Sequence, residues 1–137
     1  MVDRVPDAPE PTVDTAGYWQ AAAEGRLTIG SCRSCGKVHF YPRRRCPECL
    51  GAETELRQVS GRGTVYSYSV MRRAKVLYAI AYVALEEGVT IMSNLVRCDF
   101  DAIAIGMPVE VVFVAAGNGA MVPMFRPIAG SKLQQET

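Results

Sequence analysis

Cys32-Arg33-Ser34-Cys35 and Cys46-Pro47-Glu48-Cys49 form two Cys-x-x-Cys pairs, separated by the ten residues 36–45. Each pair predicts a tight turn that presents two sulfur atoms to one point. Four thiolates at the corners of a tetrahedron suit Zn²⁺, which binds sulfur at about 2.3 Å and has no redox chemistry. Iron on the same four sulfurs and disulfide bonds remain as alternatives. The pattern therefore favours a structural zinc site with the ligands Cys32, Cys35, Cys46 and Cys49.

The segment around these cysteines is too short to bury a hydrophobic core of its own. Metal binding is therefore expected to supply its folding energy. The only histidine, His39, lies between the pairs, but four cysteines already complete the site. The fifth cysteine, Cys98, is expected to be a small buried hydrophobic residue. The arginines 43–45 either offset the negative charge of the thiolates or bind a ligand.

The residues after this segment have the period-two pattern of β-strands. In the strand expected at 64–70, Tyr66, Tyr68 and Val70 are predicted to share one face, and Val65, Ser67 and Ser69 the other. Further strands are expected at 78–85, 90–96, 108–114 and 121–125. A short helix is expected over 18–24, with Thr15 as its N-cap and Gly25 at its end. Five strands and one helix predict a mainly β protein built on a small barrel.

The composition suits one compact domain. The chain has 137 residues, of which 49% are hydrophobic and 21% charged, and its formal net charge is +1. So small a charge draws the chain neither to nucleic acid nor to membranes. The longest apolar run, 76–85, is too short to span a bilayer, and the first residues lack the apolar core of a secretory signal. These features predict a cytoplasmic protein with no membrane partner.

Charge is distributed unevenly along the chain. Residues 1–16 are acidic and contain three prolines, which predicts a flexible arm. A basic loop follows the first barrel strand, where Arg72, Arg73 and Lys75 occur without an acidic neighbour. Such a loop is either a solvated tip or a site for phosphate groups. No hydrolase, zinc-protease, P-loop or dinucleotide-binding motif is present in the sequence, so the chain is not expected to be an enzyme on its own.

Several short motifs occur in a specific order. Besides the cysteine pairs they are Tyr18-Trp19, Glu24-Gly25-Arg26-Leu27, Phe40-Tyr41-Pro42-Arg43, Gly61-Arg62-Gly63-Thr64-Val65-Tyr66, Asn94-Leu95-Val96, Ile105-Gly106-Met107-Pro108-Val109 and Phe125-Arg126-Pro127. In this order the chain resembles the DUF35 family of acyl-CoA-associated proteins. The resemblance implies a helix and rubredoxin-like zinc ribbon over 17–56, a five-stranded OB-fold barrel over 57–128, and a flexible tail over 129–137.

The resemblance also implies a function. The chain would be a non-catalytic accessory subunit of a thiolase-type or related acyl-CoA-processing enzyme, such as an acyltransferase or aldolase. Its partner in a hetero-oligomer would be a thiolase-like or lipid-transfer-protein-like enzyme that carries the catalytic residues. The small subunit would stabilise that partner and help to form the CoA-thioester site, with Arg72, Arg73 and Lys75 expected to bind the phosphates of CoA. The loop 71–77 is shorter and more basic than in many family members, which would alter acyl preference or docking if this loop meets substrate or partner.

Two other functions use the same modules. Zinc ribbons and OB-folds also bind single-stranded nucleic acid, and Tyr66 and Tyr68 would then stack on bases. The small net charge and the acidic arm argue against this alternative, because nucleic-acid-binding domains are often strongly basic. Iron in the four-thiolate site would instead make the chain a redox protein.

Overall fold

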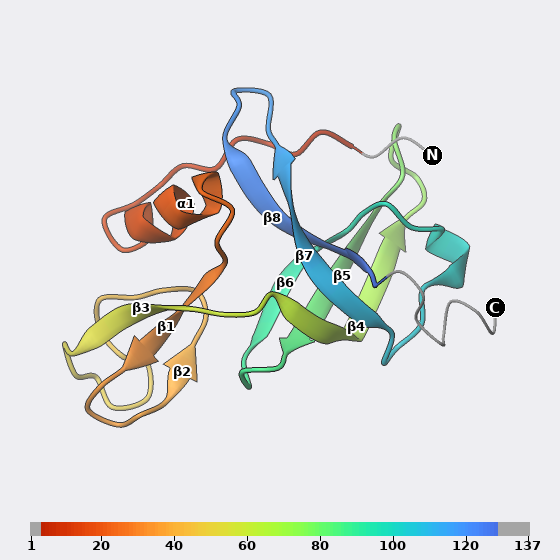
Figure 1. The fold of residues 1–137 in the computed structure, drawn as a ribbon. Helices are drawn as coiled ribbons and strands as arrows, with labels where there is room; N and C mark the ends of the chain where they lie inside the picture. Colours follow the sequence, from red (N-terminus) through yellow and green to blue (C-terminus); the bar gives the residue numbers. More distant parts are fainter. Residues whose placement is uncertain (1–3, 129–137) are drawn as a thin grey trace.

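The computed structural model describes residues 4–128, which fold into an N-terminal unit and a β-barrel (Figure 1). The N-terminal unit contains the helix α1 (Ala16–Ala23) and three antiparallel strands in the order β2-β1-β3. These strands are β1 (Thr28–Cys32), β2 (Val38–His39) and β3 (Thr54–Gln58). The two cysteine pairs lie at the end of β1 and in the connection from β2 to β3, so this unit is the predicted ribbon.

The C-terminal unit is a closed barrel with the strand order β4-β5-β6-β8-β7. Its elements are β4 (Arg62–Met71), β5 (Tyr78–Leu85), β6 (Thr90–Leu95), the 3₁₀ turn η1 (Phe100–Ala102), β7 (Pro108–Ala115) and β8 (Met121–Pro127). Neighbouring strands are antiparallel except β6 and β8, which run parallel and meet at the pair Leu95 and Phe125. The expectation of a mainly β protein with an N-terminal helix and a five-stranded barrel is confirmed.

The alternation expected in the first barrel strand is interrupted by a β-bulge. Val65 lies opposite Val83, but Ser67 lies opposite Tyr82, so Tyr66 is an extra residue in β4. Val65 is buried in the core, whereas Ser67 shares the outer surface with Tyr82. The expectation that Val65 shares a face with Ser67 and Ser69 is therefore wrong, because an inserted residue exchanges the two sides of a strand from that point on. For the same reason Tyr66 does not share a face with Tyr68 and Val70, which lie opposite the buried residues Ala81 and Ala79.

Helix α1 begins and ends close to the predicted bounds. Gly25 has a φ of +79°, which glycine adopts without strain, and its N–H donates to the carbonyl of Ala22 at 3.0 Å. Thr15 precedes the helix, but its hydroxyl makes no capping bond and instead accepts from the N–H of Thr12 at 2.9 Å. The helix is held by burial of Tyr18, Ala21 and Ala22 rather than by the expected side-chain cap.

One hydrophobic core runs through both units. Tyr18 of α1, Leu27 just before β1 and Ile29 within it belong to the same buried cluster as Val83 and Phe125 of the barrel. Helix α1 also packs against β8 (Figure 1). Since β8 meets β6 at a single pair, α1 covers the side of the barrel where strand pairing is weakest.

Residues 4–14 precede α1, form neither helix nor strand, and contact both units. The guanidinium of Arg4 lies 3.7 Å above the ring of Tyr78 in the barrel, and the carboxylate of Asp14 accepts from the N–H of Arg44 at 3.4 Å in the ribbon. The flexibility of the arm 1–16 stays a prediction, and the tail 129–137 lies outside the described residues. Among residues 4–128, no helix has the length and apolar character that crossing a membrane requires.

Candidate metal centre

The two Cys-x-x-Cys segments adopt the same backbone turn. The N–H of Gly36 donates to the carbonyl of Cys32 at 2.9 Å, and the N–H of Leu50 donates to the carbonyl of Cys46 at 2.9 Å. The closing residue has a positive φ in both turns, 76° at Gly36 and 62° at Leu50. In the second turn, the N–H of Glu48 also points at the Cys46 sulfur at 3.4 Å. The sequence thus builds two equivalent turns, each of which presents two sulfur atoms.

The four sulfur atoms of these turns form one compact cluster. All four Sγ atoms lie within 4.8 Å of one another. The Sγ atoms of Cys32 and Cys49 are 3.6 Å apart, and those of Cys35 and Cys46 are 3.7 Å apart. Four sulfurs at about 2.3 Å from a tetrahedral zinc ion would be about 3.8 Å from one another, so the spacing fits this ion. Both Sγ–Sγ distances are well beyond the length of a disulfide bond, about 2.05 Å, which argues against the disulfide alternative.

The sulfurs influence one another's protonation. The backbone N–H groups of Cys35 and Ser34 lower the pKa of Cys32 to about 7, against the effect of its burial. The N–H of Gly51 also lowers the pKa of Cys49, but the Cys32 sulfur and burial outweigh it and raise that pKa to about 11. Negative charge on one sulfur therefore disfavours charge on the next. A bound cation would replace the protons and stabilise all four thiolates together.

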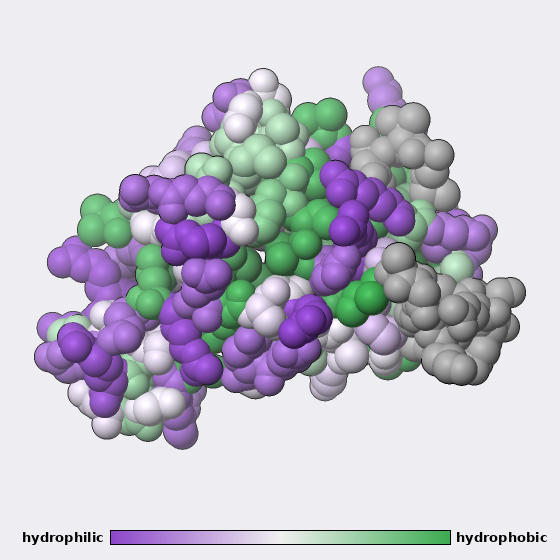
Figure 2. Space-filling model, in the orientation of Figure 1, coloured by the Kyte–Doolittle hydropathy of each residue, from purple (hydrophilic) through white to green (hydrophobic). Residues whose placement is uncertain are grey.

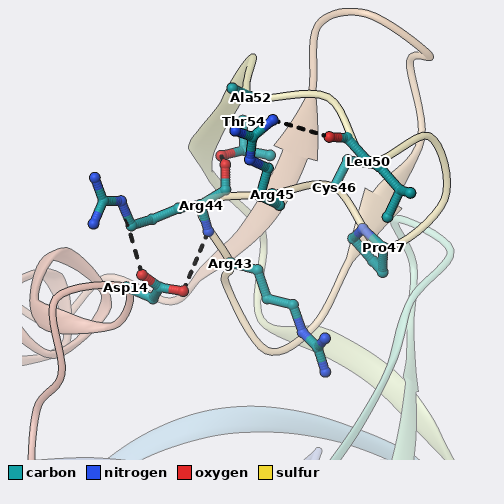
Figure 3. Close-up of a pocket in the computed structure, with 9 residues that line it drawn as sticks. All are labelled: Asp14, Arg43, Arg44, Arg45, Cys46, Pro47, Leu50, Ala52 and Thr54. Carbon is teal, nitrogen blue, oxygen red and sulfur yellow. Dashed lines mark hydrogen bonds and ion pairs between the residues drawn. The ribbon is translucent and has the colours of Figure 1, made fainter.

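The arginines 43–45 point in different directions rather than toward one ligand (Figure 3). They line a hollow of about 740 Å³, but two of them already have partners. Arg44 lies 4.0 Å from the carboxylate of Asp14, and Arg45 donates to the carbonyl of Leu50 at 3.3 Å, where it supports the second cysteine turn. These contacts favour the structural alternative, in which the arginines support the ribbon and offset thiolate charge, over ligand binding.

The predicted phosphate-binding residues lie in the loop that joins β4 to β5, on the side of the barrel away from the ribbon (Figure 1). The guanidinium of Arg72 pairs with the carboxylate of Asp101 at 2.7 Å. Arg73 and Lys75 are exposed, and neither pairs with an acidic residue in the described part of the chain. The structure therefore groups the three cations in one loop but does not bring them to the metal centre.

His39 and Cys98 lie outside the four-cysteine cluster. The His39 ring is buried against Gly30 of the neighbouring strand, so close that a Cβ on Gly30 would lie only 2.1 Å from its Nε2. Neither ring nitrogen has a hydrogen-bond partner within residues 4–128, and burial, followed by the charge of Arg43, lowers the pKa of His39. Cys98 packs partly buried against the main core. His39 therefore packs the ribbon as a neutral ring.

Both units match models of one protein family. Residues 19–55 match the rubredoxin-like zinc ribbon domain of ChsH2, and residues 56–114 match the C-terminal OB-fold domain of ChsH2. The chain belongs to this family. The ribbon with four clustered cysteines and the closed barrel that follows it are the two domains that the family models describe.

Relatives and a solved structure agree with this assignment. The chain is 39% identical over 104 residues to a "DUF35 domain-containing scaffold protein" of Methanocaldococcus jannaschii, covering 69% of this chain and 73% of the relative. It is 33% identical over 93 residues to the "Benzoylsuccinyl-CoA thiolase subunit BbsA" of Thauera aromatica, covering 58% of this chain and 65% of the relative. A solved structure described as "Ltp2-ChsH2(DUF35) aldolase" matches with a TM-score of 0.78 and 34% identity, over 88% of this chain and 98% of the matched chain.

A further relative is much longer than this chain. The "Probable enoyl-CoA hydratase alpha subunit" of Thermomonospora curvata is 34% identical over 126 residues, which cover 87% of this chain but 40% of the relative. The chain thus spans less than half of that protein.

Proposed function

We propose that this chain is a non-catalytic accessory subunit of a thiolase-type or related acyl-CoA-processing enzyme, acting in a cytoplasmic hetero-oligomer. The observation that carries the proposal is its likeness, over 88% of its length, to the chain matched in the Ltp2-ChsH2(DUF35) aldolase. Relatives described as a thiolase subunit and as a hydratase alpha subunit support the same class of partner.

The surface of the chain supports a non-catalytic role. Charged side chains of the barrel pair with one another at the surface, as Arg62 does with Glu86 at 3.2 Å and Arg126 with Glu110 at 3.0 Å. The only histidine is packed inside the ribbon. A general base, a nucleophile and a substrate cavity do not converge anywhere in residues 4–128, so the partner would supply the catalytic residues.

The role proposed for zinc is structural. Four cysteine ligands would occupy every position of a tetrahedral ion and leave none for a substrate. The ion would join the end of β1, at Cys32, to the second cysteine turn. The ribbon needs such a cross-link because its sheet is small and β2 has two residues.

The role proposed for the β4–β5 loop is to meet the phosphates of a CoA thioester that also contacts the partner. Arg73 and Lys75 are the exposed cations of this loop that have no acidic partner among the described residues. Arg72 would exchange its exposed pair with Asp101 for a phosphate, at small cost because both side chains are in contact with water.

Affinity capture of the tagged chain from its own cells, followed by reconstitution with the recovered enzyme, tests the proposal. We expect an acyl-CoA enzyme in a constant ratio to the chain, a colourless preparation with about one zinc per chain, and no thioester turnover by the chain alone. A partner without acyl-CoA chemistry, or turnover by the isolated chain, would overturn the proposed function. Bound iron would overturn the structural role of zinc and favour the redox alternative.

A further inference from the structure

Apart from Arg62 at the first position of β4, the outer face of three barrel strands, β4, β5 and β6, contains no charged side chain. Cross-strand pairs place Ser67, Tyr82 and Met92 side by side across β4, β5 and β6, because Tyr82 lies opposite both of the others. The same registers define the remaining outward positions, and together these residues are called the uncharged face: Thr64, Ser67, Ser69, Met71, Tyr78, Ile80, Tyr82, Ala84, Thr90, Met92 and Asn94. The alternate residues of β5 point inward and are buried.

This composition is unusual for a surface in contact with water. A soluble surface with about 25–35% charged residues would place roughly three charges among these eleven positions. Tyr82 is 47% exposed and Met92 is 60% exposed, so neither is needed to fill the barrel. Depletion of charge and enrichment of tyrosine and methionine are typical of the centre of a protein interface.

A groove continues the uncharged face toward the ribbon. Trp19, Phe40 and Tyr41 form one wall and Tyr82 and Met92 form the other, and the open hollow between them has a volume of about 450 Å³. The ribbon wall is rigid, because the ring of Tyr18 lies within 6 Å of all three wall rings. We call this hollow the aromatic groove. At protein interfaces, rigid pockets of this kind are typically filled by a protruding side chain of the partner.

The β7–β8 hairpin borders the groove and continues the absence of charge. The run 111–125 contains no acidic or basic residue, and its residues Val122 and Pro123 line the groove. Figure 2 shows hydrophobic surface gathered over this hairpin, with hydrophilic residues around it. Charged residues return at the two ends of the uncharged face, at Arg73 and Lys75 in the loop before β5 and at Glu87 in the turn after it.

We propose that the uncharged face and the aromatic groove are the docking surface for the acyl-CoA enzyme partner. The matching surface of the partner is uncharged at its centre, inserts one apolar side chain into the groove, and holds its CoA thioester beside Arg73 and Lys75. This inference rests on the proposed function and adds where the partner binds.

The charge pattern favours this occupant over two others. Single-stranded nucleic acid needs cations along its path, and the one cation that the described residues place over the uncharged face is Arg4, which lies on Tyr78 at one end. In a symmetric dimer of this chain centred on the uncharged face, the two aromatic grooves would face each other, and no side chain would fill either of them. An enzyme subunit of different shape can fill the groove and match the charged ends.

The test uses the full-length chain with zinc and the recombinant enzyme recovered in the capture experiment. We expect the double variant Tyr82→Asp and Met92→Asp to bind this enzyme at least about thirtyfold more weakly, because both side chains lie at the centre of the surface. The matched control is Val13→Asp with Ile105→Asp, which places the same charges at residues that are 79% and 69% exposed and lie outside the face. The control is expected to bind like the wild-type chain.

Folding is checked by zinc content and by the thermal midpoint of each variant. If the double variant does not fold, Met92→Lys replaces it, since Met92 is 60% exposed and its replacement leaves the core intact. A second readout uses Trp19, the only tryptophan. Labelled with 5-fluorotryptophan, the chain has one ¹⁹F resonance, which is expected to shift when unlabelled partner is added.

The outcomes separate the two proposals. Wild-type binding that the folded face variants do not weaken, or a ¹⁹F resonance that the partner leaves in place, overturns the docking surface and leaves the accessory function intact. A chain that forms dimers through Met92 and Tyr82 overturns the choice of occupant. A wild-type chain that binds no acyl-CoA enzyme overturns both proposals.

Discussion

Replacing Gly30 with alanine is expected to destabilise the zinc ribbon, because the new methyl group has no space. Gly30 lies opposite His39 in the pairing of β1 with β2, and a Cβ at this position would lie 2.1 Å from Nε2 and 2.5 Å from Cδ2 of the imidazole. Ordinary contacts between carbon atoms are about 3.5–4.0 Å long, so these two distances are too short by about 1–2 Å. The ring is only 6% exposed, so it cannot turn toward the solvent without disturbing its neighbours.

The magnitude follows from the cost of overpacking. Extra methyl groups in a well-packed site typically cost about 1–3 kcal/mol, and this contact is at the severe end, so we expect a loss of about 3 kcal/mol in the free energy of unfolding. In a His39→Ala background the ring is gone and Gly30→Ala should cost less than about 1 kcal/mol. The two substitutions should therefore couple by about 2 kcal/mol in a double-mutant cycle.

The assay is urea unfolding at a fixed excess of zinc, followed through the fluorescence of Trp19. Zinc affinity measured against a chelator provides an independent readout, because metal binding and ribbon folding are linked. Equal losses on Gly30→Ala in both backgrounds would contradict the contact, since the methyl group would then meet something other than His39. Undiminished stability of the single variant would show that the ring moves freely.

Four other outcomes follow from the same geometry. Cys32→Ser should abolish zinc binding, unfold the ribbon and prevent capture of the partner. Circular dichroism should still detect the barrel strands, with a lower thermal midpoint. Normal capture of the partner would refute the structural role of the ion. Arg73→Glu with Lys75→Glu should raise the KM of the reconstituted enzyme for a CoA thioester about tenfold or more and leave kcat unchanged, and an unaltered KM would make the loop a solvated tip. Leu50→Gly should stabilise the zinc-bound chain by up to about 1 kcal/mol in urea unfolding, because Leu50 has a φ of 62°, which favours glycine; a destabilised variant would contradict this. The single histidine, His39, should titrate below pH 6.5 by NMR, because burial of the ring lowers its pKa. The stability that the neutral ring contributes is then present above pH 6.5 and is lost as the pH falls through the lowered pKa. Titration at or above pH 6.5 would contradict the burial of the ring.

The spacing of the cysteines and the alternation of the barrel strands predicted most of the architecture. Both signals are local, because a Cys-x-x-Cys turn and a half-buried strand need only their own residues to be recognised. The strand β3 was not predicted. Its residues 55–58 are all exposed, so it has no apolar face, and it exists because it pairs with β1 and supplies Glu55 to Arg33 at 3.1 Å.

The bulge at Tyr66 and the aromatic groove could not be predicted for a different reason. A bulge depends on how β4 registers with β5, and the composition of β4 is the same with or without it. The groove depends on how the ribbon sits against the barrel, which brings Trp19 and Tyr41 close to Met92 from distant parts of the chain. The absence of charge in β5 and β6 was visible in the sequence, but its meaning required knowing which residues point outward.

The shared core has a consequence for how the protein is made. Ile29 and Tyr18 are buried together with barrel residues, and α1 covers the barrel where β6 and β8 meet at one pair. Without the ion the ribbon would unfold and α1 would no longer cover the barrel. A strand edge would then be open to aggregation. Since translation delivers the ribbon first, zinc can bind before the barrel strands emerge. The supply of zinc at the ribosome would then decide how much of the subunit survives to meet its enzyme.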